Sequence, residues 1–417
     1  MPQPIPHIHQ AVDHLFRHES GKMIAVLTKL LGLQHLELAQ DIVQDSLLQA
    51  MNVWSYKGLP DNPAAWLYRV ARNKAIDYLR REKNWSAISS QYAYLLEADH
   101  SETTDSLFEA QAIEDSMLLM LFACCHPSIS SEAQLALALK TLCGLTNAEI
   151  ARAFLTQEDT IAKRIYRARE KMRAENVQLV LPSTAQLQAR LHIVLHCLYL
   201  LFNEGYFATH PDRLIREELC EEAIRLTYLL TQHPLTAVPR THALLALLCF
   251  QASRLPTRLD DQGNIILLQQ QNRSLWYRPL INKGFEYLEL AAEPFELSPY
   301  HIEAGIASLH AAAPSFEQTD WPTIYKLYET LSVLQPGPVV LLNKAIAAAY
   351  AIHPSEALSQ LQSIKGLEEF CLYHTAMGEM HFLLQQKDAA LHYYQQALQL
   401  AASRPEQQLL QSKIHLC

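Results

Sequence analysis

The sequence predicts an all-α protein made of several helical domains. Glycine is scarce, at 11 of 417 residues, whereas leucine, alanine, glutamine and glutamate fill long stretches. These residue types favour helices over sheets. Apolar residues also recur at spacings of three and four along most of the chain, which is the period of an amphipathic helix. A chain of this length is expected to form two or three domains.

Charge and cysteine content restrict the class of protein. The formal net charge is −9, but the basic residues are clustered, and a basic stripe matters more for DNA binding than the total. No run of about 18 apolar residues and no signal-peptide pattern is found, so we expect a cytoplasmic protein with no membrane partner. The eight cysteines contain no CxxC pair. Although Cys124, Cys125 and His126 are adjacent, no second pair follows at zinc spacing, so we expect no metal site and no cofactor.

Three helices are predicted within the first 83 residues. Apolar spacing predicts them over 11–31, 36–54 and 64–83. Gly32 ends the first, and the loop 55–63, with a glycine and two prolines, ends the second. The second helix has a polar face that includes Asp41, Gln44 and Asp45. The third has a basic face made of Arg69, Arg72, Lys74, Arg80, Arg81 and Lys83.

Residues 144–173 predict a helix-turn-helix. Thr146 and Glu149 have the spacing of a capping box for a short helix, and Thr156 with Asp159 has it for a longer one. The second helix has a predicted buried stripe, Ile161, Ile165, Ala168 and Met172. Off that stripe lie Thr160, Lys163, Arg164, Arg167 and Arg169. A basic second helix of this kind enters the major groove of DNA. An ordinary helical hairpin with a solvated basic face is the alternative, and the paired capping boxes favour DNA binding.

Two of these segments together resemble a known family. DIVQDSLLQAMNVW followed by PAAWLYRVARNKAIDYLRRE resembles region 2 of a bacterial RNA polymerase sigma factor of the extracytoplasmic-function class, and 144–173 resembles region 4. The resemblance implies a region 2 domain over 11–83, an acidic linker over 84–116 and a region 4 domain over 117–177. One departure is the turn Phe154-Leu155-Thr156, where the family usually has glycine.

The resemblance also implies partners and site residues. Core RNA polymerase would bind the polar face of Asp41, Gln44 and Asp45. Single-stranded bases of the −10 promoter element need stacking and hydrogen-bonding groups, and backbone phosphates need basic side chains. The residues implied to contact the −10 element are Tyr56, Asn62, Trp66, Arg69, Arg72, Asn73, Lys74, Arg80 and Arg81. The residues implied to contact the −35 element are Thr160, Lys163, Arg164, Arg167 and Arg169. Such a factor performs no covalent catalysis, so we expect no enzyme activity.

The linker is strongly acidic: residues 84–115 contain seven acidic residues and no lysine or arginine. It is either a solvated tether or a mimic of phosphate charge near the polymerase channel.

Residues 183–417 are predicted to form a tetratricopeptide-like domain of paired helices. Gly378, Ala390, Tyr394 and Ala397 have the repeat's spacing of small and aromatic residues, and Ala345, Ala357 and Leu361 match it 33 residues earlier. Together with LYLLFNEGY and QNRSLWYRPLI, this resembles the helical extension of one sigma-factor subgroup. We expect a protein or peptide partner and regulation in cis, of either sign, although a passive appendage is the alternative.

Two details of this C-terminal domain stay open in the sequence. Residues 203–206 are either a helix end or the lining of a groove. Arg254, Arg258, Arg273 and Arg278 are either buried structural residues paired with glutamates or an anion or partner site.

Two other classes of protein remain as alternatives. A helix-turn-helix regulator with a helical-repeat sensor domain would not bind core polymerase, but it leaves the region 2 pattern unexplained. A helical-repeat enzyme has no support from a nucleophile–base pair, a phosphate loop or metal spacing.

Overall fold

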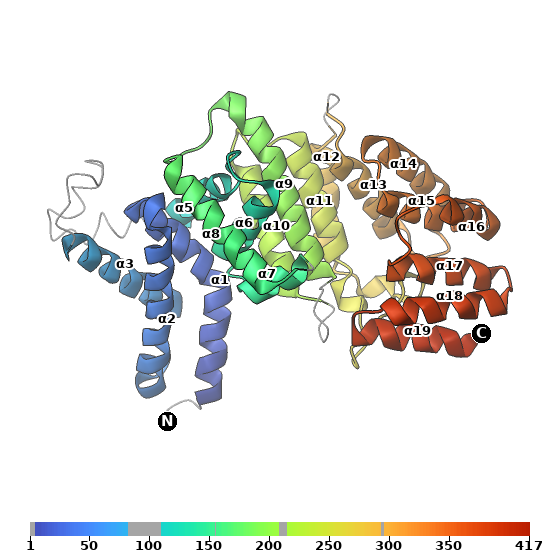
Figure 1. Ribbon diagram of the computed structural model, residues 1–417, viewed down its shortest axis with the longest axis horizontal. Helices are drawn as coiled ribbons and strands as arrows, with labels where there is room; N and C mark the ends of the chain where they lie inside the picture. Colours follow the sequence, from blue (N-terminus) through green and yellow to red (C-terminus); the bar gives the residue numbers. More distant parts are fainter. Residues whose placement is uncertain (1–4, 82–109, 155, 208–214, 293–295) are drawn as a thin grey trace. The chain divides into compact units, whose positions relative to one another are not determined.

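The computed structural model describes residues 5–81, 110–154, 156–207, 215–292 and 296–417. These residues are helical except for turns, loops and one antiparallel bridge between Leu259 and Ile265, which confirms the predicted all-α class. The chain divides into two compact units, Met1–Cys197 and Leu198–Cys417. Figure 1 shows the helices of each unit in chain order. No helix in the described residues is both long enough and apolar enough to cross a membrane.

The first unit holds the segments predicted to bind polymerase and DNA. Its helices are α1 (Ile5–Leu31), η1 (Leu33–His35), α2 (Leu36–Lys57), α3 (Pro63–Arg81), α5 (Ala110–Cys124), α6 (Ser131–Leu142), α7 (Asn147–Ala153), α8 (Glu158–Ala174) and the first part of α9 (Thr184–Tyr206). Gly32 and Gly58, with φ of 89° and 79°, follow α1 and α2. Helix α2 continues to Lys57, and α5 begins inside the predicted linker 84–116. Residues 82–109, which include the first part of that linker, lie outside the described residues.

Helix α1 is the centre of the first unit. From Ser20 to Leu31 its residues are buried except for Lys22 and Lys29, which are half-buried. A helix buried on all sides has neighbours on all sides, and α1 packs against α2 and α3 and also against α5 and α6. At Gly21 a Cβ would lie 2.0 Å from the carbonyl oxygen of Leu142 at the end of α6. The segments 11–83 and 117–177 therefore share one core.

The first half of α9 belongs to the first unit, so this unit extends beyond residue 183, where we expected the C-terminal domain to begin. Leu187, Leu191, Val194 and Leu195 are buried. The Sγ atoms of Cys125 and Cys197 are 3.9 Å apart. Burial raises the pKa of the Cys124 thiol to about 12, so this thiol is protonated at neutral pH and packs as an apolar group.

The second unit is a succession of helices. After the end of α9 come α10 (Glu217–Gln232), α11 (Pro239–Ala252), η5 (Leu255–Thr257), η6 (Leu268–Gln270), η7 (Arg273–Leu275), α12 (Arg278–Leu290), α13 (Pro299–Ala312), α14 (Trp321–Leu334), α15 (Pro338–Ala351), α16 (Pro354–Ser363), α17 (Cys371–Leu383), α18 (Lys387–Leu400) and α19 (Arg404–Leu416). From α10 to α19 each α-helix packs against the next α-helix in sequence. A proline stands at the start of most of them, where its missing N–H costs nothing.

Small residues allow the last helices to approach closely. A Cβ on Gly378 of α17 would lie 2.6 Å from the Tyr394 ring of α18, and Ala390, Tyr394 and Ala397 are buried. The predicted pattern of small and aromatic residues thus corresponds to a real helix contact.

The arginine cluster of the second unit serves the fold. The Arg258 guanidinium lies 3.8 Å from the centre of the Tyr206 ring and donates to the Tyr206 carbonyl oxygen. Arg273 donates to the carbonyl oxygens of His310 and Ala313, at 2.8 and 3.0 Å. Of the two alternatives that the sequence left open, the contacts of these two half-buried arginines favour the structural one, but their partners are backbone carbonyl oxygens and, for Arg273, the Thr319 hydroxyl rather than glutamates.

Candidate nucleic-acid interface

The helix-turn-helix of the first unit is formed by α7 and α8. The capping box predicted for α7 is complete, because Thr146 Oγ1 accepts from the Glu149 N–H at 3.1 Å and Glu149 Oε2 accepts from the Thr146 N–H at 2.7 Å. The cap predicted for α8 is wrong. Thr156 still donates its N–H to the carbonyl oxygen of Ala151, at 2.9 Å, so α8 begins only at Glu158 after Gln157.

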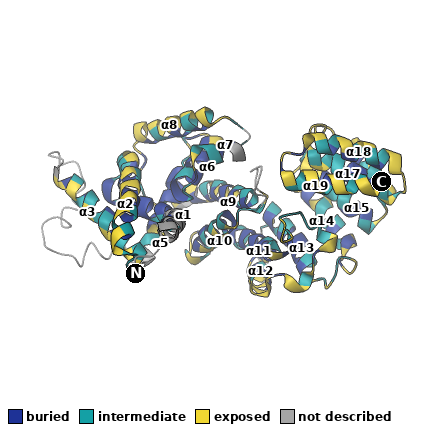
Figure 2. Cartoon of the chain, turned by 90° about the horizontal axis from the view of Figure 1, so that it is seen from below, coloured by how far each residue is buried: buried dark blue, intermediate teal, exposed yellow. Residues whose placement is uncertain are grey.

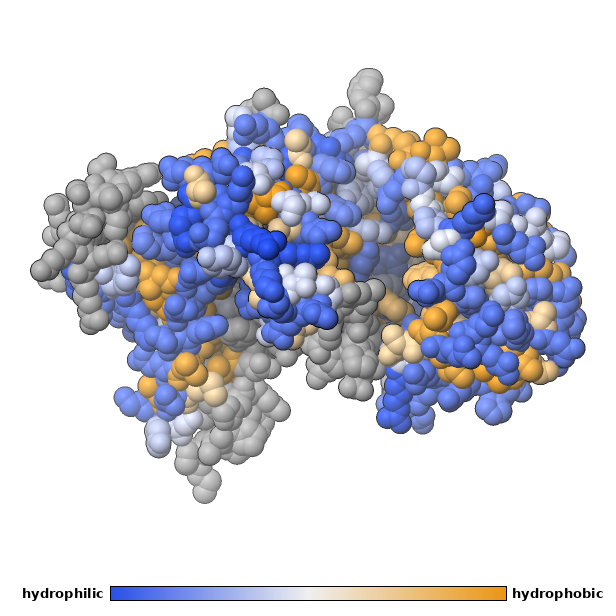
Figure 3. Space-filling view, viewed as in Figure 1, coloured by the Kyte–Doolittle hydropathy of each residue, from blue (hydrophilic) through white to orange (hydrophobic). Residues whose placement is uncertain are grey.

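Helix α8 buries its predicted stripe and exposes a basic side. Its buried residues are Ile161, Ile165, Ala168 and Met172. Exposed residues run along the helix in Figure 2, and strongly hydrophilic surface gathers over it in Figure 3. Lys163 and Arg167 are exposed, and Thr160 and Arg164 are half-buried. Lys163 pairs with Asp159 at 2.6 Å, and Arg164 pairs with Glu132 of α6 at 3.0 Å. Exposed ion pairs of this kind are weak and exchange readily for phosphate.

Arg169 lies apart from this basic side, at the contact of α8 with α2, and its role at the −35 element stays a prediction. Its guanidinium contacts α2, donating to Gln40 Oε1 at 2.6 Å and Glu37 Oε1 at 3.3 Å, and its side chain is only 16% exposed. Burial lowers the pKa of Arg169 and the Glu37 carboxylate opposes that shift. The spacing held a signal for the partial burial of Arg169, though not for its partners, because Arg169 follows Ile165 by four residues and precedes Met172 by three, at the edge of the buried stripe.

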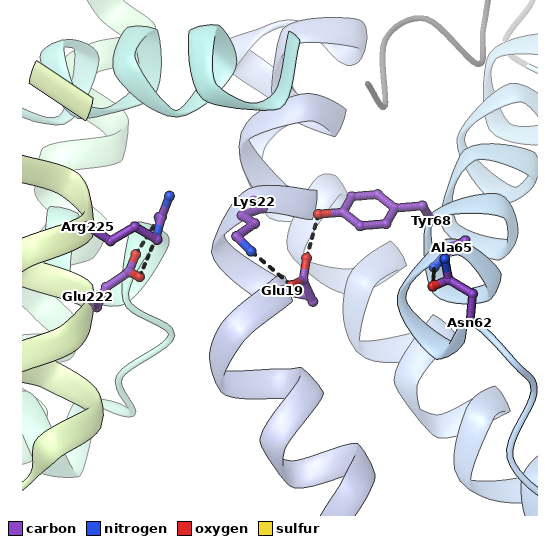
Figure 4. Close-up of polar contacts among 7 residues, drawn as sticks. All are labelled: Glu19, Lys22, Asn62, Ala65, Tyr68, Glu222 and Arg225. Carbon is purple, nitrogen blue, oxygen red and sulfur yellow. Dashed lines mark hydrogen bonds and ion pairs between the residues drawn. The ribbon is translucent and has the colours of Figure 1, made fainter. Parts of the chain in front are cut away.

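Helix α3 is positioned by its own cap and by α1. Asn62 Oδ1 accepts from the Ala65 N–H at 3.0 Å, which caps the first turn (Figure 4). The Tyr68 hydroxyl donates to Glu19 Oε2 at 2.7 Å, and Lys22 binds the other oxygen of Glu19 at 2.9 Å. The Trp66 ring packs edge-on against the buried Trp54, with centroids 5.3 Å apart. These contacts anchor α3 while its basic side remains on the surface.

The predicted −10 residues are distributed over the end of α2, the loop after it and α3. Tyr56 is 89% exposed and lies within α2 rather than in the loop. Asn62, Arg69, Asn73 and Arg80 are exposed, while Trp66, Arg72 and Lys74 are half-buried. The side chain of Arg81 lies outside the described part of the chain.

The predicted polymerase face is exposed on α2. Asp41, Gln44 and Asp45 all point to solvent, opposite the buried Ile42, Val43 and Leu47. Lys74 Nζ lies 3.5 Å from Asp45 Oδ2, an exposed pair. The sequence did not predict that Glu37 and Gln40, on another side of the same helix, hold Arg169 of α8.

The described residues contain no group of three or more histidine, cysteine or acidic side chains that could hold a metal ion. Most of the predicted contact residues that the structure describes are exposed polar or charged side chains on helices. Two basic helix faces, one belonging to a helix-turn-helix, define a DNA-binding protein.

Comparisons with known proteins specify the class. Residues 15–84 match the model for sigma-70 region 2, and 119–172 match the model for sigma-70 region 4. An RNA polymerase sigma-E factor of the extracytoplasmic-function class from Salmonella typhimurium is 32% identical over 137 residues, covering 31% of this chain and 69% of the relative. The corresponding factor of Haemophilus influenzae is 26% identical over 166 residues, covering 39% and 85%. The chain belongs to the sigma-70 family, whose function is transcription initiation.

A longer match extends beyond the two sigma regions. An uncharacterised protein of Rhizobium meliloti (strain 1021) is 36% identical over 375 residues, covering 89% of this chain and 88% of the relative. Residues 190–292 also match a family of unknown function, DUF6596. The C-terminal unit is thus shared with a relative and not peculiar to this chain.

Proposed function

We propose that this protein binds core RNA polymerase through α2, the −10 element through α3 and the −35 element through α8. The observation that carries the proposal is the exposure of three charged faces in this order along the chain, acidic on α2 and basic on α3 and α8. Basic side chains bind the backbone phosphates, and the exposed second helix of a helix-turn-helix enters the major groove.

Co-purification with core polymerase tests the proposal against a regulator that binds DNA alone. The protein should bind purified core polymerase and direct transcripts from a specific promoter. A helix-turn-helix regulator without polymerase binding would do neither, and that outcome would replace the proposal. Sequencing the transcripts made when the protein is overproduced would identify the promoter for later tests.

Charge reversal on α2 should weaken polymerase binding. Asp41→Lys replaces an exposed carboxylate with an ammonium group. Since the proposed partner surface is basic, the two positive charges would repel each other, and we expect the affinity for core polymerase to fall about tenfold. Asp45→Lys should act in the same direction, although it also removes the pair with Lys74. Glu329→Lys, at an exposed position of α14, is the matched control and should bind normally. An Asp41→Lys protein that melts early but binds the core normally would show that the face is misassigned.

We further propose that the second unit regulates the first in cis. Residues 178–417 carry 16 basic and 22 acidic residues, so the tail is acidic while α8 is basic. Because the two belong to one chain, each is present at a high effective concentration for the other. Even weak contacts between the tail and α8 would then shift the equilibrium between active and inactive forms of the protein. A partner that binds the tetratricopeptide-like tail would shift that equilibrium again.

Truncation should reveal this regulation if the cut leaves the first unit complete. A cut after Leu181 removes the half of α9 that completes the first unit, so this protein should melt at lower temperature than one cut after Phe207. The longer fragment should change promoter-dependent transcription severalfold at equal soluble concentration. A rise would identify inhibition and a fall would identify activation, whereas unchanged transcription would make the tail a passive appendage.

A further inference from the structure

The second unit contains a polar cavity that the proposed function does not use. Its volume is about 240 Å³. It is lined by residues of α9 and α11 and of the three consecutive helices α13, α14 and α15. Seven of the lining side chains carry polar groups: Tyr199, Asn203, Tyr206, Gln251, Glu303, Tyr328 and Asn343. A well-formed pocket with a few convergent polar groups is the usual form of a small-molecule site.

Glu303 is the charged group of this cavity. The Tyr199 hydroxyl donates to Glu303 Oε2 at 3.0 Å, which holds the carboxyl in place. Among the described residues that line the cavity, none is a lysine, an arginine or a histidine. Burial raises the pKa of Glu303 to about 7, and the Tyr199 hydrogen bond only partly opposes that shift. A buried carboxylate without a cation is costly, and a positively charged ligand would remove that cost.

The other walls suit an organic cation better than a metal ion. The rings of Tyr199, Phe202 and Tyr328 line the cavity, and aromatic rings attract ammonium groups. The Tyr206 ring also lines it, but the Arg258 guanidinium already lies 3.8 Å from its centre. The Tyr206 hydroxyl is buried and has no hydrogen-bond partner within the described residues. A single carboxylate is too few charged ligands for a tightly held divalent cation, which needs six or more oxygens in most protein sites. The volume corresponds to about eight waters, and thus to a molecule of roughly ten non-hydrogen atoms.

We propose that this cavity binds a small organic cation, an amine of about that size, with its ammonium group against Glu303 and its remaining atoms against the tyrosine and phenylalanine rings. Residues 203–206 of α9 then have both roles that the sequence left open. They end the helix, and Asn203 and Tyr206 line the site. Binding does not depend on the assignment of polymerase or promoter contacts, because all the lining residues lie in the second unit.

Thermal unfolding and calorimetry of the full-length protein test the proposal with three amines, 2-phenylethylamine, agmatine and putrescine. Two probes of matched shape lack the positive charge, 2-phenylethanol and 3-phenylpropanoate. At least one amine should raise the melting temperature and bind saturably, while the neutral and anionic probes should not. Glu303→Gln keeps the size and an acceptor for Tyr199, so it should fold and should weaken amine binding at least about tenfold. Glu329→Gln, an exposed change on α14, should leave binding unchanged.

Three results would overturn the proposal. One is that no amine binds. Another is that 2-phenylethanol binds as well as 2-phenylethylamine, which would make the cavity an apolar pocket. The third is unchanged amine affinity in Glu303→Gln, which would place the amine elsewhere on the surface.

Discussion

Replacing Gly21 with alanine should strongly destabilise the first unit. In the middle of a helix this change normally stabilises by about 1 kcal/mol, because alanine is the better helix former. Here the new Cβ would lie 2.0 Å from the carbonyl oxygen of Leu142 and 2.8 Å from its carbonyl carbon. These are backbone atoms, so no rotamer change relieves the contact and α1 must move away from α6. Overpacking of this kind costs about 1–3 kcal/mol or more.

We expect the clash to outweigh the propensity gain. A net loss of about 2 kcal/mol lowers the melting temperature of a unit of this size by roughly 4–8 °C. Gly305→Ala is the matched control, because Gly305 lies inside α13 and its added Cβ would be 3.5 Å from Leu327 Cδ1, an ordinary contact. It should be neutral or stabilising. Circular dichroism melts compare the two variants with the parent. If Gly21→Ala melts at or above the parent temperature, the close approach of α1 and α6 is wrong.

Removing the exposed basic side of α8 should have the largest effect on activity. Lys163→Ala and Arg167→Ala together remove two cations whose side chains face solvent. Each phosphate contact contributes to affinity and to its salt dependence, and a bidentate contact to guanine is worth about 1–3 kcal/mol. We therefore expect at least a tenfold loss of transcription from the cognate promoter, with core binding unchanged. Changes in the −35 bases should then matter less than they do for the parent.

The control for this prediction lies on the same helix. Lys171 is also exposed, but it stands in the last turn of α8 and pairs with Glu175 at 3.4 Å. Recognition helices contact bases through their N-terminal part, so Lys171→Ala should keep the base preference. Arg164→Ala should have an intermediate effect because Arg164 is half-buried beside Glu132. If the Lys163, Arg164 and Arg167 variants all keep the promoter preference of the parent, other residues recognise the bases.

The sequence predicted the elements of the fold well because local patterns specify helices. The helix predicted over 36–54 corresponds to α2, which begins at Leu36 and ends at Lys57, and the buried stripe of α8 contains the four residues expected. The predicted start of α8 was wrong because a capping pattern is short and the Thr156 N–H donates to the carbonyl oxygen of Ala151 in α7. Neither the contact of Arg169 with α2 nor the Glu303 cavity could be derived in this way, since each joins residues more than 100 positions apart.

The burial of α1 on every side has a consequence for promoter binding. Elements named for positions −10 and −35 lie about 25 base pairs apart, or roughly 85 Å of duplex at 3.4 Å per pair. A compact unit of 197 residues has a radius of gyration of only about 16 Å. Contact with both elements therefore requires α5, α6 and α8 to leave α1 and α2, which breaks the α1–α6 packing at Gly21 and the Arg169–Glu37 pair. The closed unit would then be a resting population, and the apparent affinity for a promoter that carries both elements would be the intrinsic affinity multiplied by the open fraction.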